Sequence, residues 1–288
     1  MQQISSFKNQ TGGCLYLVPT PIGNLDDMTF RAVKTLRDVD LIAAEDTRHT
    51  QQLLNHFQIA TREISFHEHN TEQRIPELLA KLQAGLKIAQ CSDAGMPSIS
   101  DPGKELVVAA IKAGIPVVPL PGANAGLTAL IASGLTPQPF YFYGFLERKH
   151  QQQVTALEKM VNRPETMIFY EAPHRLKKTL ATMAEVFGDQ RPVVVARELT
   201  KRYEEFNRGK LGEMRDWFAN HQARGEFVIL VGGNPHPTEK RDQGQPKSLT
   251  EQVDAAIVDG LSTNAAIKLI AKRNGVKRQK LYKQYHNL

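Results

Sequence analysis

Short, continuously apolar runs alternate with helix-length amphipathic runs over residues 14–133, and this order restricts the fold more than any other feature. The longer runs carry apolar side chains at helical spacing, as Phe30, Val33 and Leu36 do. The predicted strands are residues 14–18, 41–44, 63–66, 86–91 and 115–120, and the predicted helices are residues 29–39, 51–57, 72–83, 105–113 and 127–133. Strands that are apolar on both faces and separated by helices form a parallel sheet covered on both sides. The sequence therefore predicts an α/β domain over residues 1–134.

A second α/β domain is predicted over residues 135–235, because the pattern changes after Gly134. Pro137 and Pro139 interrupt both the helical and the strand period, which is typical of a linker. The predicted strands are residues 140–146, 167–170, 193–197, 205–208 and 227–231, and the predicted helices include residues 176–187 and 213–221. The strands are longer and helices are interspersed among them, which favours mixed strand directions in this sheet.

Positive charge is concentrated at the end of the chain. Residues 234–288 contain ten Lys+Arg and five Asp+Glu, a net charge of +5, which leaves +1 of the total of +6 for residues 1–233. This asymmetry favours an anionic macromolecule, above all a nucleic acid, as the partner.

The same basic stretch divides into a linker, residues 236–248, and a helical segment, residues 249–288. The linker is rich in charges, proline and glycine, which argues against packed structure. The segment predicts three short helices at residues 249–258, 264–273 and 277–285, of which the last two resemble a helix-turn-helix pair. The last helix carries cations suited to RNA phosphates, namely Lys277, Arg278 and Lys280. The alternative use of these helices is packing or dimerisation of the protein.

Composition excludes several other classes of protein. No apolar run approaches the roughly 18–20 residues of a membrane-spanning helix, and residues 1–13 lack the apolar stretch of a secretory signal. Cys14 and Cys91 each lie within or at the end of an apolar run, which indicates reduced core thiols rather than a disulfide. We therefore expect a cytoplasmic protein with no membrane partner.

Three loops rich in small and turn-forming residues follow predicted strands of the first domain: residues 19–24, 92–103 and 121–126. Because the carboxyl ends of parallel strands meet at one edge of a sheet, these loops should line a single cleft there. Few of their side chains are bulky, so a ligand would be bound largely through backbone N–H and C=O groups, as an adenine nucleoside can be. An ordinary surface loop is the alternative for residues 92–103.

The common motifs for phosphate, metal and acyl chemistry do not occur. There is no G-x-x-x-x-G-K-[ST] and no G-x-G-x-x-G after a strand, which argues against nucleoside-triphosphate and dinucleotide enzymes. His67 and His69 alternate on a strand end and lack an evident third ligand, so no metal site is expected. What remains is a polar cleft with carboxylates and cations, which suits a reaction that needs positioning and proton removal.

Six motifs resemble those of the tetrapyrrole-methylase-like, class III group of S-adenosylmethionine methyltransferases. They are residues 15–29, 43–48, 92–103, 119–125, 169–175 and 196–201. Within this group, the match is to members that methylate the ribose 2′-oxygen of a cytidine in small-subunit ribosomal RNA. The resemblance implies the tetrapyrrole methylase fold, with two α/β domains and a helical C-terminal segment. It also implies S-adenosylmethionine in the cleft, no metal and a homodimer acting on ribosomal RNA or the assembled small subunit.

The resemblance further assigns the donor to the three loops. The residues that would lie against it are Pro21, Asp93, Ala94, Gly95, Met96, Ala123, Asn124 and Ala125. Asp93 is the expected polar anchor, because its neighbours offer mainly backbone contacts. The alternative for Asp93 is stabilisation of its own loop.

Methyl transfer from a sulfonium to a ribose hydroxyl requires loss of the hydroxyl proton, so a group able to accept it is expected beside the cleft. Glu45 and Asp46 are the first candidates, since they end a predicted strand there, and Glu198 and Lys201 are the second. The alternative for these residues is an ion-pair network with Arg48 or Arg197. The cations expected to hold RNA phosphates are Arg48, Arg175, Arg197 and Arg202, together with those of the last helix.

Two other functions stay open on the sequence alone. The same fold could methylate a tetrapyrrole, although a small planar substrate gives no reason for a basic helical segment. The chain could also be an RNA-binding or assembly protein that has kept the donor pocket without the activity.

Overall fold

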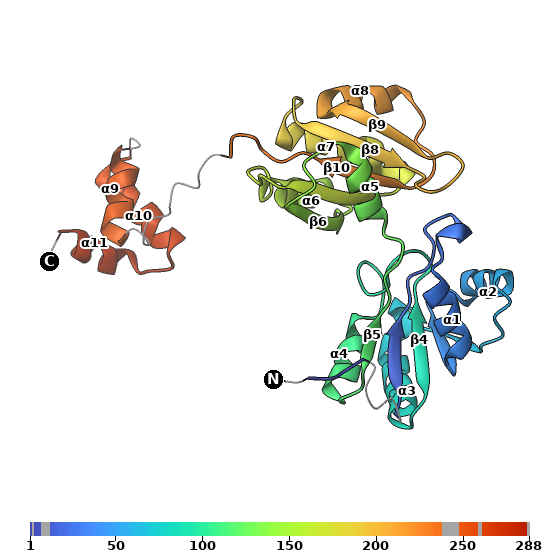
Figure 1. The fold of residues 1–288 in the computed structure, drawn as a ribbon. Helices are drawn as coiled ribbons and strands as arrows, with labels where there is room; N and C mark the ends of the chain where they lie inside the picture. Colours follow the sequence, from blue (N-terminus) through green and yellow to red (C-terminus); the bar gives the residue numbers. More distant parts are fainter. Residues whose placement is uncertain (2, 7–11, 238–247, 259–260, 287–288) are drawn as a thin grey trace. The chain divides into compact units, whose positions relative to one another are not determined.

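The computed structural model describes residues 1, 3–6, 12–237, 248–258 and 261–286 (Figure 1). The chain forms two compact units, Met1–His236 and Pro237–Leu288. Among these described residues, the first unit contains two five-stranded sheets, and the second contains three helices.

The first sheet is parallel throughout, as the sequence predicts, and has the strand order β3-β2-β4-β1-β5. Its strands are β1 (Cys14–Leu17), β2 (Leu41–Ala44), β3 (Glu63–Ser65), β4 (Lys87–Cys91) and β5 (Val117–Pro119). The helices that connect them are α1 (Phe30–Asp38), α2 (Thr47–His56), α3 (Thr71–Gln83) and α4 (Lys104–Lys112), with short 3-10 turns η1 (Leu25–Asp27) and η2 (Glu68–Asn70).

Helices cover both faces of this sheet. On one face Leu36 of α1 and Leu54 of α2 pack on Ile42, and on the other face Leu78 of α3 and Leu106 of α4 belong to the core around Ile88. Figure 1 shows α1 and α2 on one side of the sheet and α4 on the other. Burial of both faces explains why the strands are continuously apolar in sequence.

The second sheet is mixed, as predicted, with the order β6-β7-β10-β8-β9. Its strands are β6 (Phe140–Phe145), β7 (Thr166–Glu171), β8 (Pro192–Arg197), β9 (Glu205–Lys210) and β10 (Phe227–Val231). Only β6 and β7 run parallel to each other; the other neighbouring pairs are antiparallel. One face is covered by α6 (His150–Glu158), α7 (Pro173–Phe187) and α8 (Leu211–Asn220). Helix α6 was not predicted from the sequence, because it begins with a histidine and three consecutive glutamines and has a weak apolar stripe.

Helix α5 (Ala125–Ser133) covers the opposite face of the second sheet, although the sequence analysis placed it in the first domain. Ala129 and Leu130 pack against Ile168 of β7 and Leu230 of β10. Helix α5 therefore packs on the second sheet, although the predicted boundary of the second domain, at residue 135, lies after it. Most side chains of α5 are small or apolar, so its sequence carries no polar stripe that could show which sheet it covers.

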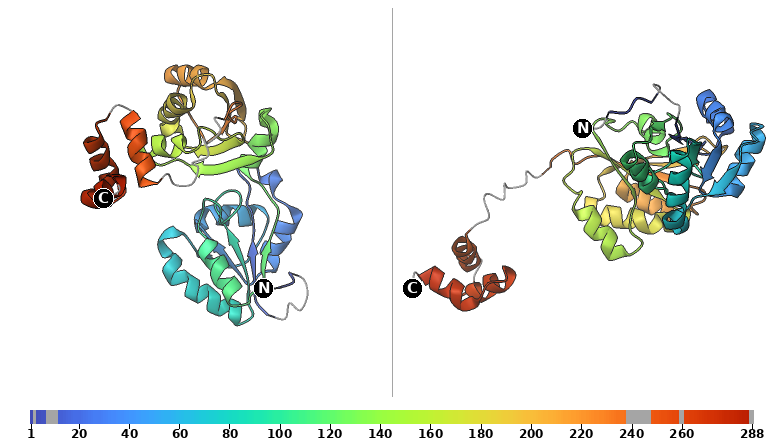
Figure 2. Two further views of the ribbon diagram at one scale, coloured as in Figure 1. Left: turned by 90° about the vertical axis from the view of Figure 1, so that its left-hand side faces the viewer. Right: turned by 90° about the horizontal axis from the view of Figure 1, so that it is seen from below.

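The second unit has its own core. Its helices are α9 (Leu249–Val258), α10 (Thr263–Arg273) and α11 (Arg278–His286), close to the three predicted (Figure 2). Val253, Ile267 and Leu281 contribute one buried side chain from each helix. Of the predicted linker, residues 238–247 lie outside the described residues. Lys277, Arg278 and Lys280 are exposed.

The structure also shows the state of the two cysteines and the character of the helices. Cys14 and Cys91 are both free and buried, as predicted. Among the described residues, no helix combines the length and apolar character needed to cross a membrane.

Candidate active site

A cavity of about 510 Å³ opens at the carboxyl edge of the first sheet, where the second sheet faces it. All three predicted loops reach it, through Ile22 after β1, Asp93 after β4 and Asn124 after β5. The second sheet contributes Tyr170 at the end of β7 and Val228 of β10. The volume lies within the range of about 300–1,000 Å³ that small-molecule sites occupy.

The loops after β1 and β4 are joined to each other. Thr20 and Gly95 exchange backbone hydrogen bonds of 3.0 Å, and the Thr20 hydroxyl donates to the Ser92 carbonyl at 3.0 Å. Strands β1 and β4 are neighbours in the sheet, which places their loops side by side. Hydrogen bonds between these two loops therefore hold this part of the cavity wall in place.

Most of the residues predicted to contact a donor line this cavity. They are Asp93, Ala94, Gly95, Met96, Asn124 and Ala125. Pro21 and Ala123 do not line it, although their neighbours Ile22 and Asn124 do. The amide side chain of Asn124 caps α5, since its oxygen accepts from the Leu127 N–H at 2.8 Å.

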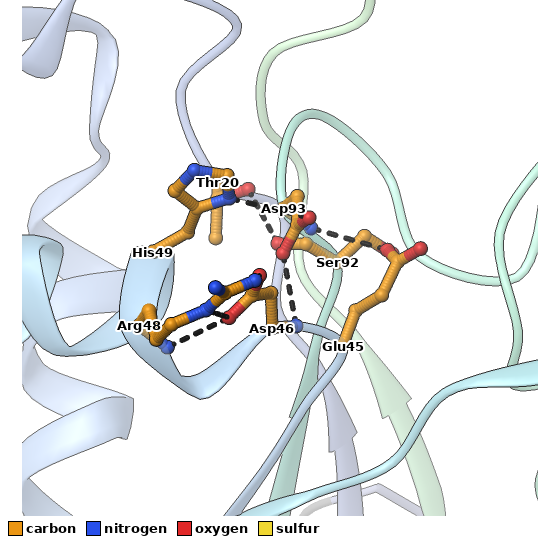
Figure 3. A network of polar contacts seen from close by, with 7 residues as sticks. All are labelled: Thr20, Glu45, Asp46, Arg48, His49, Ser92 and Asp93. Atoms are coloured by element: carbon orange, nitrogen blue, oxygen red, sulfur yellow. Dashed lines mark hydrogen bonds and ion pairs between the residues drawn. The ribbon is translucent and has the colours of Figure 1, made fainter. Parts of the chain in front are cut away.

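The carboxylate of Asp93 joins its loop to the end of β2 (Figure 3). One oxygen accepts from the backbone N–H of Asp46 at 3.0 Å, and the other lies 3.4 Å from Nδ1 of His49. Its own N–H donates to Glu45 at 3.3 Å. Asp93 thus stabilises the site by linking two strand ends, in addition to lining the cavity, which is close to the alternative raised on sequence.

The two adjacent acids, Glu45 and Asp46, have different surroundings. Asp46 caps α2 and accepts from the N–H of Arg48 at 2.9 Å, while the Arg48 guanidinium reaches its two oxygens at 3.0 and 2.6 Å. These hydrogen bonds from Arg48 hold the pKa of Asp46 well below its usual range. Asp46 does not line the cavity, so the structure supports the ion-pair role rather than proton acceptance.

Glu45 lines the cavity, and its carboxyl has a raised pKa. Burial is the main cause, and the negative charge of Asp101 adds to it. Asp101 lines the same wall, and burial raises its pKa as well. Asp101 was not among the site residues predicted from the sequence, although it lies in the predicted loop of residues 92–103. A raised pKa makes a carboxylate beside a cavity a better proton acceptor than an ordinary one.

The second pair of candidates, Glu198 and Lys201, forms an ion-pair network. Nζ of Lys201 lies 3.0 Å from Oε1 of Glu198 and 2.8 Å from Oε2 of Glu226. Burial works against the charge, but these carboxylates raise the pKa of Lys201, so it stays an ammonium and is a poor base. Its aliphatic stem lies over Gly23, where an added Cβ would come within 2.4 Å of Cγ of Lys201. Lys201 thus lines the cavity and packs on the loop after β1.

The arginines predicted to bind phosphate are largely engaged by the protein. Nε of Arg175 lies 3.1 Å from Glu171 and Nη2 donates to the Leu146 carbonyl at 2.6 Å. These contacts, with a side chain only 19% exposed, favour a structural role for Arg175 over the predicted contact with RNA. Arg197 donates to the Arg224 carbonyl at 2.7 Å and pairs with Glu205. Arg48 is 86% exposed but bound to Asp46.

Within the part of the chain that the structure describes, one group of side chains could supply three metal ligands: Asp46, His49 and Asp93. Both oxygens of Asp46 already accept from Arg48, and Asp93 accepts from the Asp46 N–H. We therefore assign no ion to this group.

A parallel sheet and a mixed sheet that enclose one cavity at a carboxyl edge define a two-domain α/β enzyme. Residues 14–215 match the model of the Tetrapyrrole (Corrin/Porphyrin) Methylases. The solved uroporphyrin-III C-methyltransferase of Thermus thermophilus, complexed with S-adenyl homocysteine, shares the fold at a TM-score of 0.54. The match covers 76% of this chain and 97% of that one at 18% identity.

Nearer relatives match along the whole sequence. The ribosomal RNA small subunit methyltransferase I of Streptococcus pyogenes serotype M18 is 54% identical over 289 residues, covering 100% of both chains. That of Bacillus subtilis is 51% identical over 276 residues, covering 95% of this chain and 94% of its own. The chain belongs to the tetrapyrrole methylase family and, within it, groups with the ribosomal RNA small subunit methyltransferase I proteins.

Proposed function

We propose that this methyltransferase transfers the methyl group of S-adenosylmethionine to the ribose 2′-oxygen of a cytidine in small-subunit ribosomal RNA. The observation that carries the proposal is the 51–54% identity, over 95–100% of the chain, to proteins named for small-subunit ribosomal RNA methylation. These matches include the C-terminal segment, which lies beyond the family model's residues 14–215.

The cavity suits the donor. Its wall is made of the loops after β1, β4 and β5, whose exposed backbone groups can bind an adenosine without a phosphate clamp. Glu45 and Asp101 add negative charge, which is complementary to the positive charge of a sulfonium. The related fold solved with S-adenyl homocysteine supports the same ligand class.

The reaction needs positioning and the removal of one proton. When the donor is bound, its sulfonium supplies an activated methyl group. The ribose oxygen attacks the methyl carbon, the carbon–sulfur bond breaks with its electron pair going to sulfur, and the hydroxyl proton departs. Of the four residues proposed from sequence, Glu45 is best placed to accept that proton, because it lines the cavity and has a raised pKa.

The partner in this proposal is ribosomal RNA, free or in the small subunit, and the enzyme is a homodimer. The exposed Lys277, Arg278 and Lys280 support an RNA contact by the helical unit. Sedimentation of the purified protein tests the dimer, because a dimer has twice the mass of the 288-residue chain.

The function is tested by incubating the protein with labelled S-adenosylmethionine and small ribosomal subunits from cells that lack it. Free ribosomal RNA and uroporphyrinogen III are parallel acceptors, and a calorimetric titration checks donor binding. Label in the RNA or the subunits is expected. Label only in the tetrapyrrole would contradict the proposed substrate, and donor binding without transfer to any acceptor would favour a non-catalytic protein.

A further inference from the structure

The phenyl ring of Phe145 lines the cavity and yet is 53% exposed. Phe145 is the last residue of β6, and the large apolar side chain of Ile99, 58% exposed, lines the same cavity from the loop after β4. Contact of two apolar side chains on a cavity wall with water is unfavourable for the free protein, and it indicates a ligand that covers them.

An irregularity in β6 turns Phe145 toward this cavity. Its register with β7 shifts between Phe142 and Gly144, and Gly144 has a φ of +82°, which glycine tolerates best. Side chains three residues apart on a regular strand point to opposite faces. Here the rings of Phe142 and Phe145 both contact the ring of Tyr170, with distances between ring centroids of 5.1 and 5.6 Å. The bulge has therefore moved Phe145 to the face of the cavity.

The ring of Phe145 rests on a fixed support. The Tyr170 ring packs edge-on against it, and the Tyr170 hydroxyl accepts a hydrogen bond from the N–H of Gly126 at 3.1 Å. Tyr170 is thus held at both its ring and its hydroxyl. A supported ring with an exposed surface can stack a planar ligand without being ordered first.

Two cations that the protein leaves available follow Phe145 in the chain. Arg148 and Lys149 are exposed, and their side chains make no hydrogen bond or ion pair with any described residue. Arg48, Arg175 and Arg197, by contrast, are bound to acids or carbonyls. An aromatic ring followed within four residues by two exposed cations is a combination suited to single-stranded nucleic acid, which binds by base stacking and by phosphate contacts.

We propose that Phe145 is the surface on which the base of the target nucleotide stacks, with Arg148 and Lys149 contacting the adjoining phosphates. This inference rests on the proposed RNA substrate. A nucleotide turned out of its neighbours' stack can bring its ribose into a cavity, and an aromatic side chain then compensates for the stacking that its base gives up. The donor's adenine could also stack on a ring. S-adenosylmethionine has one carboxylate and no phosphate, however, and Arg148 and Lys149 do not line the cavity, so these two cations favour the RNA.

The test compares Phe145→Ala, Phe145→Leu and Phe145→Trp in the full chain. RNA affinity is measured with small subunits that lack the modification, and donor affinity by calorimetry. Phe145→Ala and Phe145→Leu should weaken RNA binding roughly 10- to 100-fold, the range for loss of one stacked base. Phe145→Trp should retain binding, and none of the three should change donor affinity. Phe140→Ala is the matched control, because Phe140 is an exposed ring (43%) at the other end of the same strand.

A second experiment addresses the cations. Replacing Arg148 and Lys149 together by alanine should lower the salt dependence of RNA binding, by about 0.7 in the logarithmic slope for each phosphate that is no longer neutralised. The control pair is Lys34→Ala with Lys112→Ala, two exposed lysines of α1 and α4 that do not line the cavity.

The outcomes separate this inference from the proposed function. If the wild-type protein methylates RNA but Phe145→Ala weakens donor binding alone, the ring holds the adenine and the inference is wrong. It is also wrong if Phe145→Leu binds RNA as the wild type does, since stacking is then not the interaction. If the wild-type protein neither binds nor methylates RNA, the proposed function itself fails.

Discussion

At the scale of single residues, Glu45 and Asp46 show how neighbours in sequence acquire different chemistry. Both follow β2 directly, and the sequence predicts either as a proton acceptor. Arg48, in the first turn of α2, saturates Asp46 with hydrogen bonds, while Glu45 lies on the cavity wall near Asp101. Which of the two acids can accept a proton depends on which of them Arg48 binds, and the order of the residues alone does not show this.

The pH dependence of methyl transfer should report Glu45. A carboxylate accepts a proton only when ionised, and burial raises the pKa of Glu45, so activity should fall as the pH decreases through that raised value. The acid limb of kcat/KM should therefore lie above the ordinary glutamate pKa of about 4.3. Glu45→Gln should lower kcat by about 100-fold or more and remove the limb.

Asp46→Asn is the matched control, because asparagine keeps a capping oxygen on α2 and Asp46 stays ionised across this pH range. It should leave the acid limb where it is. An unchanged limb in Glu45→Gln, or its loss in Asp46→Asn, would assign the titration to another group.

At the scale of elements, α5 connects the cavity to the core of the second sheet. Asn124 caps its first turn and lines the cavity, while Ala129 and Leu130 are buried on β7 and β10. The strands and most of the helices could be predicted from apolar periodicity. The sheet on which α5 packs could not be predicted, because a helix of small apolar residues fits either sheet. Helix α6 could not be predicted because three consecutive glutamines interrupt its apolar periodicity.

Removing the cap of α5 should destabilise the first unit without unfolding it. Asn124→Ala leaves the Leu127 N–H without its acceptor, which should lower the free energy of unfolding by about 1 kcal/mol. Asn124→Asp keeps the acceptor and should retain most of the stability. Urea unfolding of the three proteins measures this, and equal stability of Asn124→Ala and Asn124→Asp would show that the cap contributes nothing.

At the scale of the whole molecule, the boundary between the two units lies close to the point in the chain where the net charge changes. The helical unit has its own core and most of the net positive charge, whereas the unit that holds the cavity is nearly neutral. The charge count along the sequence is enough to show where the positive charge is concentrated. It could not predict which cations of the first unit are available, since Arg175 and Arg148 look equivalent in sequence and, of these two, Arg175 is the one paired.

Reversing the charge of Lys277, Arg278 and Lys280 to glutamate should weaken RNA binding and flatten its salt dependence, while donor affinity stays the same. Each phosphate that these cations no longer neutralise should reduce the logarithmic slope by about 0.7–0.9. The control changes Lys34, Lys112 and Lys178, three exposed lysines on α1, α4 and α7, to glutamate, with the same change in net charge. If both triple variants weaken RNA binding equally, the net charge of the protein rather than the helical unit determines RNA binding.

The most direct test of the account is the position of the transferred methyl group. Small subunits from cells lacking this protein are methylated with the purified enzyme and labelled donor, their RNA is digested, and the labelled nucleoside is identified by mass spectrometry. We predict a cytidine methylated on its ribose 2′-oxygen, and loss of that product in Glu45→Gln. Label on a base, or no label in RNA while the donor is bound, would contradict the reaction proposed for this cavity.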